Sequence, residues 1–203
     1  MTLLERITNV FTPKKTQKRD LTFNSIFPQV NSFDTDKALT LTAVWCAIRL
    51  LAESVSSLPI SVYSKQKNGD KLEDTKSPIY KLVKYKPNYY QSKITFFEFI
   101  MLSICTDGNG YAQIVRNNSG TPVQLLCIDP EKVTIVVNNN ELFYQVDDGR
   151  VLDSDDVLHF KTITDDGIDG LSPIDQCAKA LKWSESLEEF GSTFFSNGAK
   201  PSS

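Results

Sequence analysis

The chain has 203 residues and a formal net charge of −3, with 40% hydrophobic and 23% charged residues. This composition is typical of a folded soluble domain and excludes a disordered chain. No apolar run reaches the ~18 residues that a membrane span requires, and the N-terminus lacks a secretory signal, so we expect a cytosolic protein without membrane contact.

Residues 1–38 differ in character from the rest of the chain. Apolar residues at positions 3, 4, 7, 10 and 11 have helical spacing over barely three turns, and the basic run KKTQKR at 14–19 follows. A polar stretch without a period comes next, so we predict a flexible N-terminal arm over residues 1–38. A helix on a membrane surface has a similar pattern, but isolated helices this short are marginal. Docking of the arm on a neighbouring protein is the interpretation that we favour.

The body of the protein, residues 39–203, is predicted to begin with a helix. Apolar residues recur at helical spacing from Leu41 to Val55 and include Trp45, which predicts a broad buried face. Thr40 or Thr42 is a candidate cap, and Pro59 ends the pattern.

A hairpin and two further helices are predicted next. A short strand at 60–63 leads to Asn68-Gly69, a hairpin turn because both residues tolerate positive φ. Ser77-Pro78 has the form of a helix cap followed by a first-turn proline, and the helix ends at Lys86-Pro87-Asn88. Thr95 and Glu98 form a capping box for the third helix, which Gly108 is placed to end.

The pattern then changes from helical to strand-like. Five β-rich runs are separated by turn compositions and predict an antiparallel meander, at 111–116, 123–128, 133–137, 142–146 and 157–160. Ser172-Pro173 starts a long helix whose apolar positions extend from Ile174 to Phe194. The predicted fold class is therefore α+β, with helices enclosing a small, mainly antiparallel sheet.

The cysteines and the charge distribution exclude several kinds of site. Four cysteines lie far apart in apolar segments, without a Cys-x-x-Cys pair and with one histidine, which predicts buried free thiols: Cys46, Cys105, Cys127 and Cys177. Basic residues are spread along the sequence, so strong binding to nucleic-acid phosphates is not indicated. The shape of the protein could still accommodate DNA without such binding.

Three spots suggest chemistry, and each has a simpler structural interpretation. The segment DGNG at 107–110 follows a helix instead of preceding one, so it is a helix stop and not a phosphate loop. The segment DDGIDG at 165–170 lacks EF-hand spacing and is a solvated loop. His159 lies in an alternating strand near Asp153, Asp155 and Asp156, without a nucleophile-elbow motif. We therefore predict no catalytic, cofactor-binding or metal-binding residue, and no enzymatic activity.

Six short motifs in a fixed order resemble the N-terminal part of tailed-bacteriophage portal proteins of the HK97 type. They are AVWCAIRLLAES at 43–54 with Leu58-Pro59 after it, KPN at 86–88, GNGYA at 108–112, DVLHF at 156–160, GLSPI at 170–174 and FSNGA at 195–199. Each motif alone is weak, but together they cover roughly residues 39–203.

The resemblance implies a wing-like α+β domain within a ring of about twelve subunits that occupies one vertex of the capsid. Family members continue into a stem, a clip, a second stem helix and a crown, so the resemblance implies a chain truncated before stem and clip. Partners in the full-length family are other portal subunits, capsid and scaffold proteins, the terminase large subunit and head-tail adaptors. DNA passes through the ring without sequence-specific binding, and neither a cofactor nor a membrane is involved.

The resemblance therefore predicts a structural subunit, or a fragment of one, in the head-tail connector ring through which DNA is packaged. It would assemble in the host cytoplasm and, in the full-length family, become part of the virion. The alternative is a truncated prophage or satellite protein that binds full-length portal or capsid subunits, or interferes with them, without forming a channel.

Overall fold

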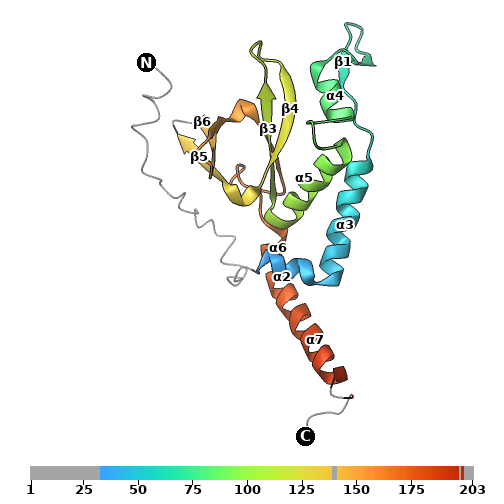
Figure 1. Ribbon diagram of the computed structural model, residues 1–203, viewed down its shortest axis with the longest axis vertical. Coiled ribbons are helices and arrows are strands. Elements are labelled where there is room, and N and C mark those ends of the chain that lie inside the picture. The colour runs from blue at the N-terminus through green and yellow to red at the C-terminus, as the bar shows by residue number, and fades with distance from the viewer. Residues whose placement is uncertain (1–32, 139–140, 197, 199–203) are drawn as a thin grey trace. The chain divides into compact units, whose positions relative to one another are not determined.

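The computed structural model describes residues 33–138, 141–196 and 198 (Figure 1). Most of the predicted arm, residues 1–32, lies outside the described residues. The first described helices are α2, Thr35–Thr40, and α3, Thr42–Ser57. The side chain of Asp34 caps α2 by accepting a bond from the backbone N–H of Asp36, at 3.0 Å. Leu41 has extended backbone angles and separates the two helices, so the predicted first helix is preceded by a short one.

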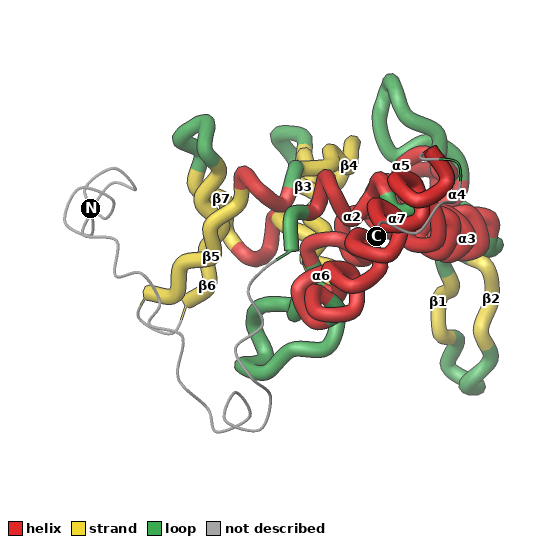
Figure 2. The backbone as a smooth tube through the Cα atoms, turned by 90° about the horizontal axis from the view of Figure 1, so that it is seen from below, coloured by secondary structure: helices red, strands yellow, loops and turns green. Residues whose placement is uncertain are grey.

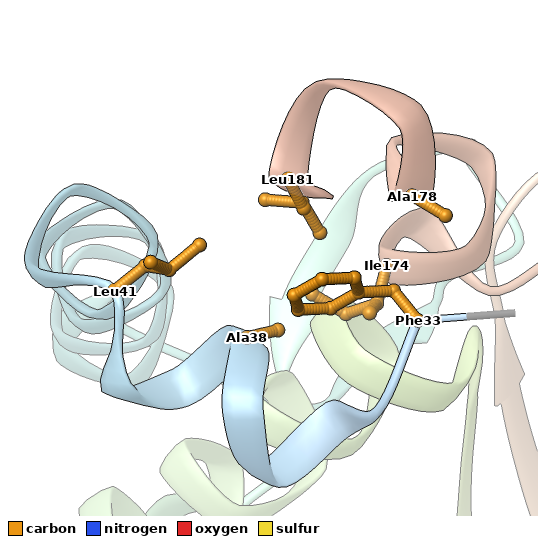
Figure 3. Packing of buried hydrophobic residues seen from close by; sticks show 6 residues of the cluster. All are labelled: Phe33, Ala38, Leu41, Ile174, Ala178 and Leu181. Atoms are coloured by element: carbon orange, nitrogen blue, oxygen red, sulfur yellow. The ribbon is translucent and has the colours of Figure 1, made fainter. Parts of the chain in front are cut away.

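Residues 33–38 belong to the packed body, which corrects their assignment to the arm. Phe33 and Ala38 are buried together with Leu41 against the start of the C-terminal helices. Figure 3 shows the side chains of Phe33, Ile174 and Leu181 pointing toward one another. Burial of this apolar surface stabilises the segment, because it removes a phenylalanine ring from water.

Helix α3 buries a narrower face than its sequence predicts. Ile48, Ala52 and Ser56 are buried, and α3 packs along α5. Trp45 is 47% exposed and Leu51 is 50% exposed, so the broad buried face is wrong. The reason is that α3 has apolar residues on several sides, while α5 is the main element packed along it and α2 touches its start.

The predicted hairpin and the next two helices are present. Strands β1, Tyr63–Lys65, and β2, Lys71–Glu73, pair antiparallel around Gly69, which has a φ of 92°. Helix α4 spans Pro78–Lys84 and begins at the predicted Ser-Pro pair.

Helix α5, Lys93–Asp107, begins earlier than its predicted capping box. Ser92 is its N-cap and accepts from the backbone N–H of Thr95 at 3.2 Å, so Thr95 lies inside the first turn. Gly108 ends the helix in the left-handed region, with a φ of 81°, as predicted.

The strands form two three-stranded antiparallel sheets beside the hairpin, and not a single meander. One sheet has the order β4-β3-β8 and the other β5-β6-β7. Their strands are β3 Asn109–Arg116, β4 Pro122–Ile128, β5 Val133–Asn138, β6 Glu141–Val146, β7 Val151–Asp153 and β8 Val157–Lys161. The short 3-10 helices η2, Pro130–Lys132, and η3, Ser154–Asp156, lie where the chain passes between the sheets. The meander fails because β8 returns to pair with β3, and β7 was not predicted.

Helix α5 covers the β4-β3-β8 sheet. Phe96 and Ile100 of α5 pack against Ala112 and Leu125 in one buried cluster, and Tyr111, Tyr144 and Leu152 belong to a second cluster between the sheets. The predicted α+β class is therefore confirmed.

The C-terminal helix is interrupted near its start. Helix α6 spans Pro173–Gln176, and Cys177 leaves helical geometry before α7, Ala178–Ser196. Cys177 and Cys46 are exposed, and Cys105 and Cys127 are partly buried, so the prediction of buried thiols is wrong for the first two. All four are free. No described helix is long and apolar enough to cross a bilayer.

Candidate assembly surface

The segment at 107–110 is a helix stop that also joins two distant parts of the chain. An added Cβ at Gly108 would lie 2.5 Å from the carbonyl oxygen of Leu171. An added Cβ at Gly170 would lie 2.2 Å from the carbonyl oxygen of Gly108. Both glycines are therefore required by the close approach of two backbone segments, and Gly108 also by its positive φ.

Asn109 holds this junction together with its side-chain amide. Its Oδ1 accepts from the backbone N–H of Gly170 at 2.8 Å, and its Nδ2 donates to the carbonyl of Gly170 at 3.0 Å. Asn109 and Gly170 are both buried. The sequence predicts only a helix stop at Asn109, because an Asn-Gly pair is typical of turns and carries no signal of a long-range partner.

His159 belongs to the same network. Its Nε2 lies 2.9 Å from Oδ1 of Asn109, and its Nδ1 lies 3.2 Å from the hydroxyl of Tyr144. Since Oδ1 is an acceptor, Nε2 carries the proton and Nδ1 accepts from Tyr144. Burial, with a smaller effect of Lys161, lowers the pKa of His159 to about 4. The neutral ring therefore links β8, β3 and β6 by structural bonds, and among the described residues its two hydrogen-bond partners are an amide and a hydroxyl.

The loop at 165–170 satisfies its polar groups internally. A carboxylate oxygen of Asp166 accepts from the backbone N–H groups of Ile168, at 2.7 Å, and Asp169, at 2.9 Å. The ammonium of Lys161 donates to the carbonyls of Gly167 and Ile168. A lysine thus occupies the carbonyl groups that a cation would need, and the described residues contain no group of three metal-ligating side chains.

The largest exposed apolar side chains of the C-terminal part lie on α7. Trp183, Leu187 and Phe190 are 65%, 71% and 69% exposed and recur at intervals of four and three residues. Phe194 follows after four more residues, and its ring stacks on that of Phe190 with centroids 6.1 Å apart. We call these four residues the α7 stripe. They share one side of the helix, since this spacing keeps side chains in line.

The opposite side of α7 is anchored to the body. Ala178 and Leu181 are buried in the cluster around Phe33, and Glu185 pairs with Lys37 at 3.6 Å. Helix α7 is therefore held at its first turns while its apolar stripe faces solvent. Exposed apolar patches of this kind mark contact sites for other proteins.

The polar side chains singled out from the sequence make structural bonds, and the α7 stripe is an exposed row of large apolar side chains on one helix. Together with the α+β fold, these features favour a protein that acts through contacts with other proteins. Comparison with known proteins agrees with that class. A family model described as "Phage portal protein" matches residues 42–203.

Individual relatives give the same result. The portal protein of Enterobacteria phage HK97 is 27% identical over 174 residues, covering 84% of this chain and 41% of the relative. Protein BeeE of Escherichia coli strain K12 is 37% identical over 97 residues, covering 47% of this chain and 60% of the relative. Among solved structures, an HK97 family phage portal protein from Corynebacterium diphtheriae has a TM-score of 0.59 at 19% identity, covering 80% of this chain and 50% of that one.

A chain from the neck of a gene transfer agent particle, computed with C6 symmetry, has a TM-score of 0.66 at 23% identity and covers 85% of this chain and 49% of that one. The chain belongs to the phage portal protein family. It spans less than two thirds of the length of each of these relatives.

Proposed function

We propose that this chain is a structural subunit of a portal ring, the head-tail connector through which phage DNA is packaged. Family membership and the likeness to neck structures support this proposal. The observation that carries it is the α7 stripe, because an exposed aromatic face on a helix anchored at one end marks a contact site for another protein surface. Aromatic side chains of this type dominate the affinity of protein interfaces.

The proposed role is structural, and the ring is the assembly through which the chain would act. Neighbouring subunits, capsid proteins and the terminase are the proposed partners, and DNA would pass without sequence-specific contact. The chain would assemble in the host cytoplasm and enter the particle as part of the vertex.

The test uses an epitope-tagged full chain in cells that produce the phage. Particles are purified on a density gradient, and quantitative mass spectrometry measures the copies of the chain for each capsid. We expect a low, fixed number of copies, as befits a single vertex. Leu187→Asp, which places a charge in the α7 stripe, should abolish incorporation, while Glu188→Gln beside it should not. Absence of the wild-type chain from particles contradicts the proposal.

The same experiment separates the alternative function. A chain that binds full-length portal subunits without completing a channel would lower the yield of DNA-filled particles when overproduced. Leu187→Asp would then restore the yield, because both functions use the α7 stripe. A subunit that assembles normally leaves the yield unchanged or raises it.

A further inference from the structure

Charge is strongly segregated along a chain whose overall charge is small. Residues 61–93 contain eight lysines and three carboxylates, a net charge of +5. Residues 129–169 contain eleven carboxylates and three lysine or arginine residues, a net charge of −8. The whole chain has a net charge of −3, so the remaining residues are neutral in sum. We call these two segments the basic pole and the acidic edge.

The basic pole consists of the β1-β2 hairpin, α4 and the loop before α5. Its only ion pair among the described residues joins Lys84 to Glu73, at 2.6 Å, and Asp74 accepts from backbone N–H groups of its own turn. Six lysines are exposed and have no ion pair within the described residues: Lys65, Lys67, Lys71, Lys76, Lys81 and Lys86. Exposed tyrosines lie among them, with Tyr63 and Tyr85 each 59% exposed. The pole therefore presents positive charge together with aromatic surface.

The acidic edge consists of the β5-β6-β7 sheet, η3 and the loop after β8. Its own basic groups are already engaged, since Lys132 pairs with Asp129, Arg150 pairs with Asp148, and Lys161 donates to carbonyls. Exposed carboxylates remain in surplus, at Glu131, Glu141, Asp147, Asp153, Asp155 and Asp165. This surface is left negative.

The two surfaces lie on opposite sides of the β4-β3-β8 sheet. Figures 1 and 2 both show β1 and α4 on one side of β3 and β4, with β5 and β6 on the other. The contacts between elements support this arrangement, because α4 packs on β4, which is an edge strand of this sheet. The two surfaces of one chain therefore face away from each other, while they are complementary to those of another copy. A contact between two different surfaces is heterologous, and its repetition generates rings when the rotation closes.

We infer that the basic pole of one copy docks on the acidic edge of the next, and that this contact fixes the direction in which subunits follow one another around the ring. The inference rests on the proposed function and specifies the surfaces that it uses. Charge complementarity mainly gives specificity and speeds association. A second copy fits better than nucleic acid, because the complementary charge lies on the same chain and the acidic edge would repel phosphates.

The first measurement is sedimentation velocity of the purified full chain over a series of concentrations. At low salt we expect weak, concentration-dependent association, and at about 1 M salt, where the Debye length is ~3 Å, we expect the part of it that the charged surfaces provide to be lost. Association that high salt leaves unchanged or strengthens overturns the inference.

The decisive measurement is a charge swap between two variants. One variant carries Lys65→Glu, Lys67→Glu and Lys71→Glu, and the other carries Asp147→Lys, Asp153→Lys and Asp155→Lys. Each alone should self-associate at least about tenfold more weakly than wild type, because like charges now face each other. Their equimolar mixture should associate again, since each variant restores the complement that the other lost. Circular dichroism must show both folded.

Glu188→Lys with Glu189→Lys is the matched control, because these exposed carboxylates of α7 belong to neither surface. The control should associate like wild type, and failure of the mixture to recover overturns the inference. A different result would assign the basic pole to nucleic acid instead. In that case duplex DNA binds the wild type but not the variant with Lys65→Glu, Lys67→Glu and Lys71→Glu, and the self-association of that variant is unchanged. These readouts use purified chain, so absence from phage particles would contradict the proposed function alone.

Discussion

Asn109 offers the sharpest test of how the segment around Gly108 is joined to the segment around Gly170. Replacing it with alanine removes the partners of both the N–H and the C=O of Gly170, which are buried at a point where an added Cβ has no room. A buried backbone group left without a partner costs about 1–3 kcal/mol, so two such groups predict a loss of about 2–6 kcal/mol. His159 loses its acceptor as well, which places the expected value in the upper part of this range.

The assay is urea unfolding followed by far-ultraviolet circular dichroism. Asn117→Ala is the matched control, because Asn117 also accepts two backbone N–H bonds, from Ser119 and Thr121, but at an exposed turn where water replaces them. We expect the control to lose about 1 kcal/mol or less. If Asn109→Ala unfolds at the same urea concentration as the control, the junction does not depend on this amide.

Three further outcomes follow from the geometry. Gly170→Ala should prevent folding or shift the Gly108 backbone, because the new Cβ would lie 2.2 Å from the carbonyl oxygen of Gly108. We expect this variant to unfold at a lower urea concentration than Asn109→Ala. Trp45→Ala should cost about half of the ~3–5 kcal/mol typical of a buried aromatic residue, because its side chain is 47% exposed, and a larger loss in the same unfolding assay would contradict its placement. His159 has a folded-state pKa of about 4, below its ordinary 6.5, so the neutral form is favoured by folding. Its contribution should be complete above pH 6.5 and lost as the pH falls toward 4, and His159→Gln should flatten this dependence.

Local signals in the sequence predicted much of the fold. The five predicted strands lie within about two residues of β3, β4, β5, β6 and β8, because alternating residues and turn compositions act over short distances. Gly108 was found as a helix end for the same reason, since its role depends on one backbone conformation.

Features that depend on distant partners were missed. The pairing of β8 with β3 is a long-range choice that strand composition does not encode, and the six residues of α2 are too few for a helical period. Trp45 was placed in the core because apolar residues occur on several sides of α3, and only the position of α5 decides which side is covered.

The two charged surfaces were missed for a different reason. Lysines look evenly distributed when the whole sequence is averaged, and the excess between 61 and 93 becomes a surface only when the hairpin and α4 are brought together. The sequence therefore indicated that nucleic-acid binding is weak, while the fold indicates where opposite charges lie.

The cluster around Phe33 fixes the base of α7. The family model matches residues 42–203, whereas Phe33, Ala38 and Leu41, against which Leu181 packs, precede that range. Helix α7 has 19 residues and is therefore about 28 Å long, so tilting its base by about 10° displaces its tip by ~5 Å. A few side chains that precede residue 42 therefore set the direction in which the aromatic stripe points.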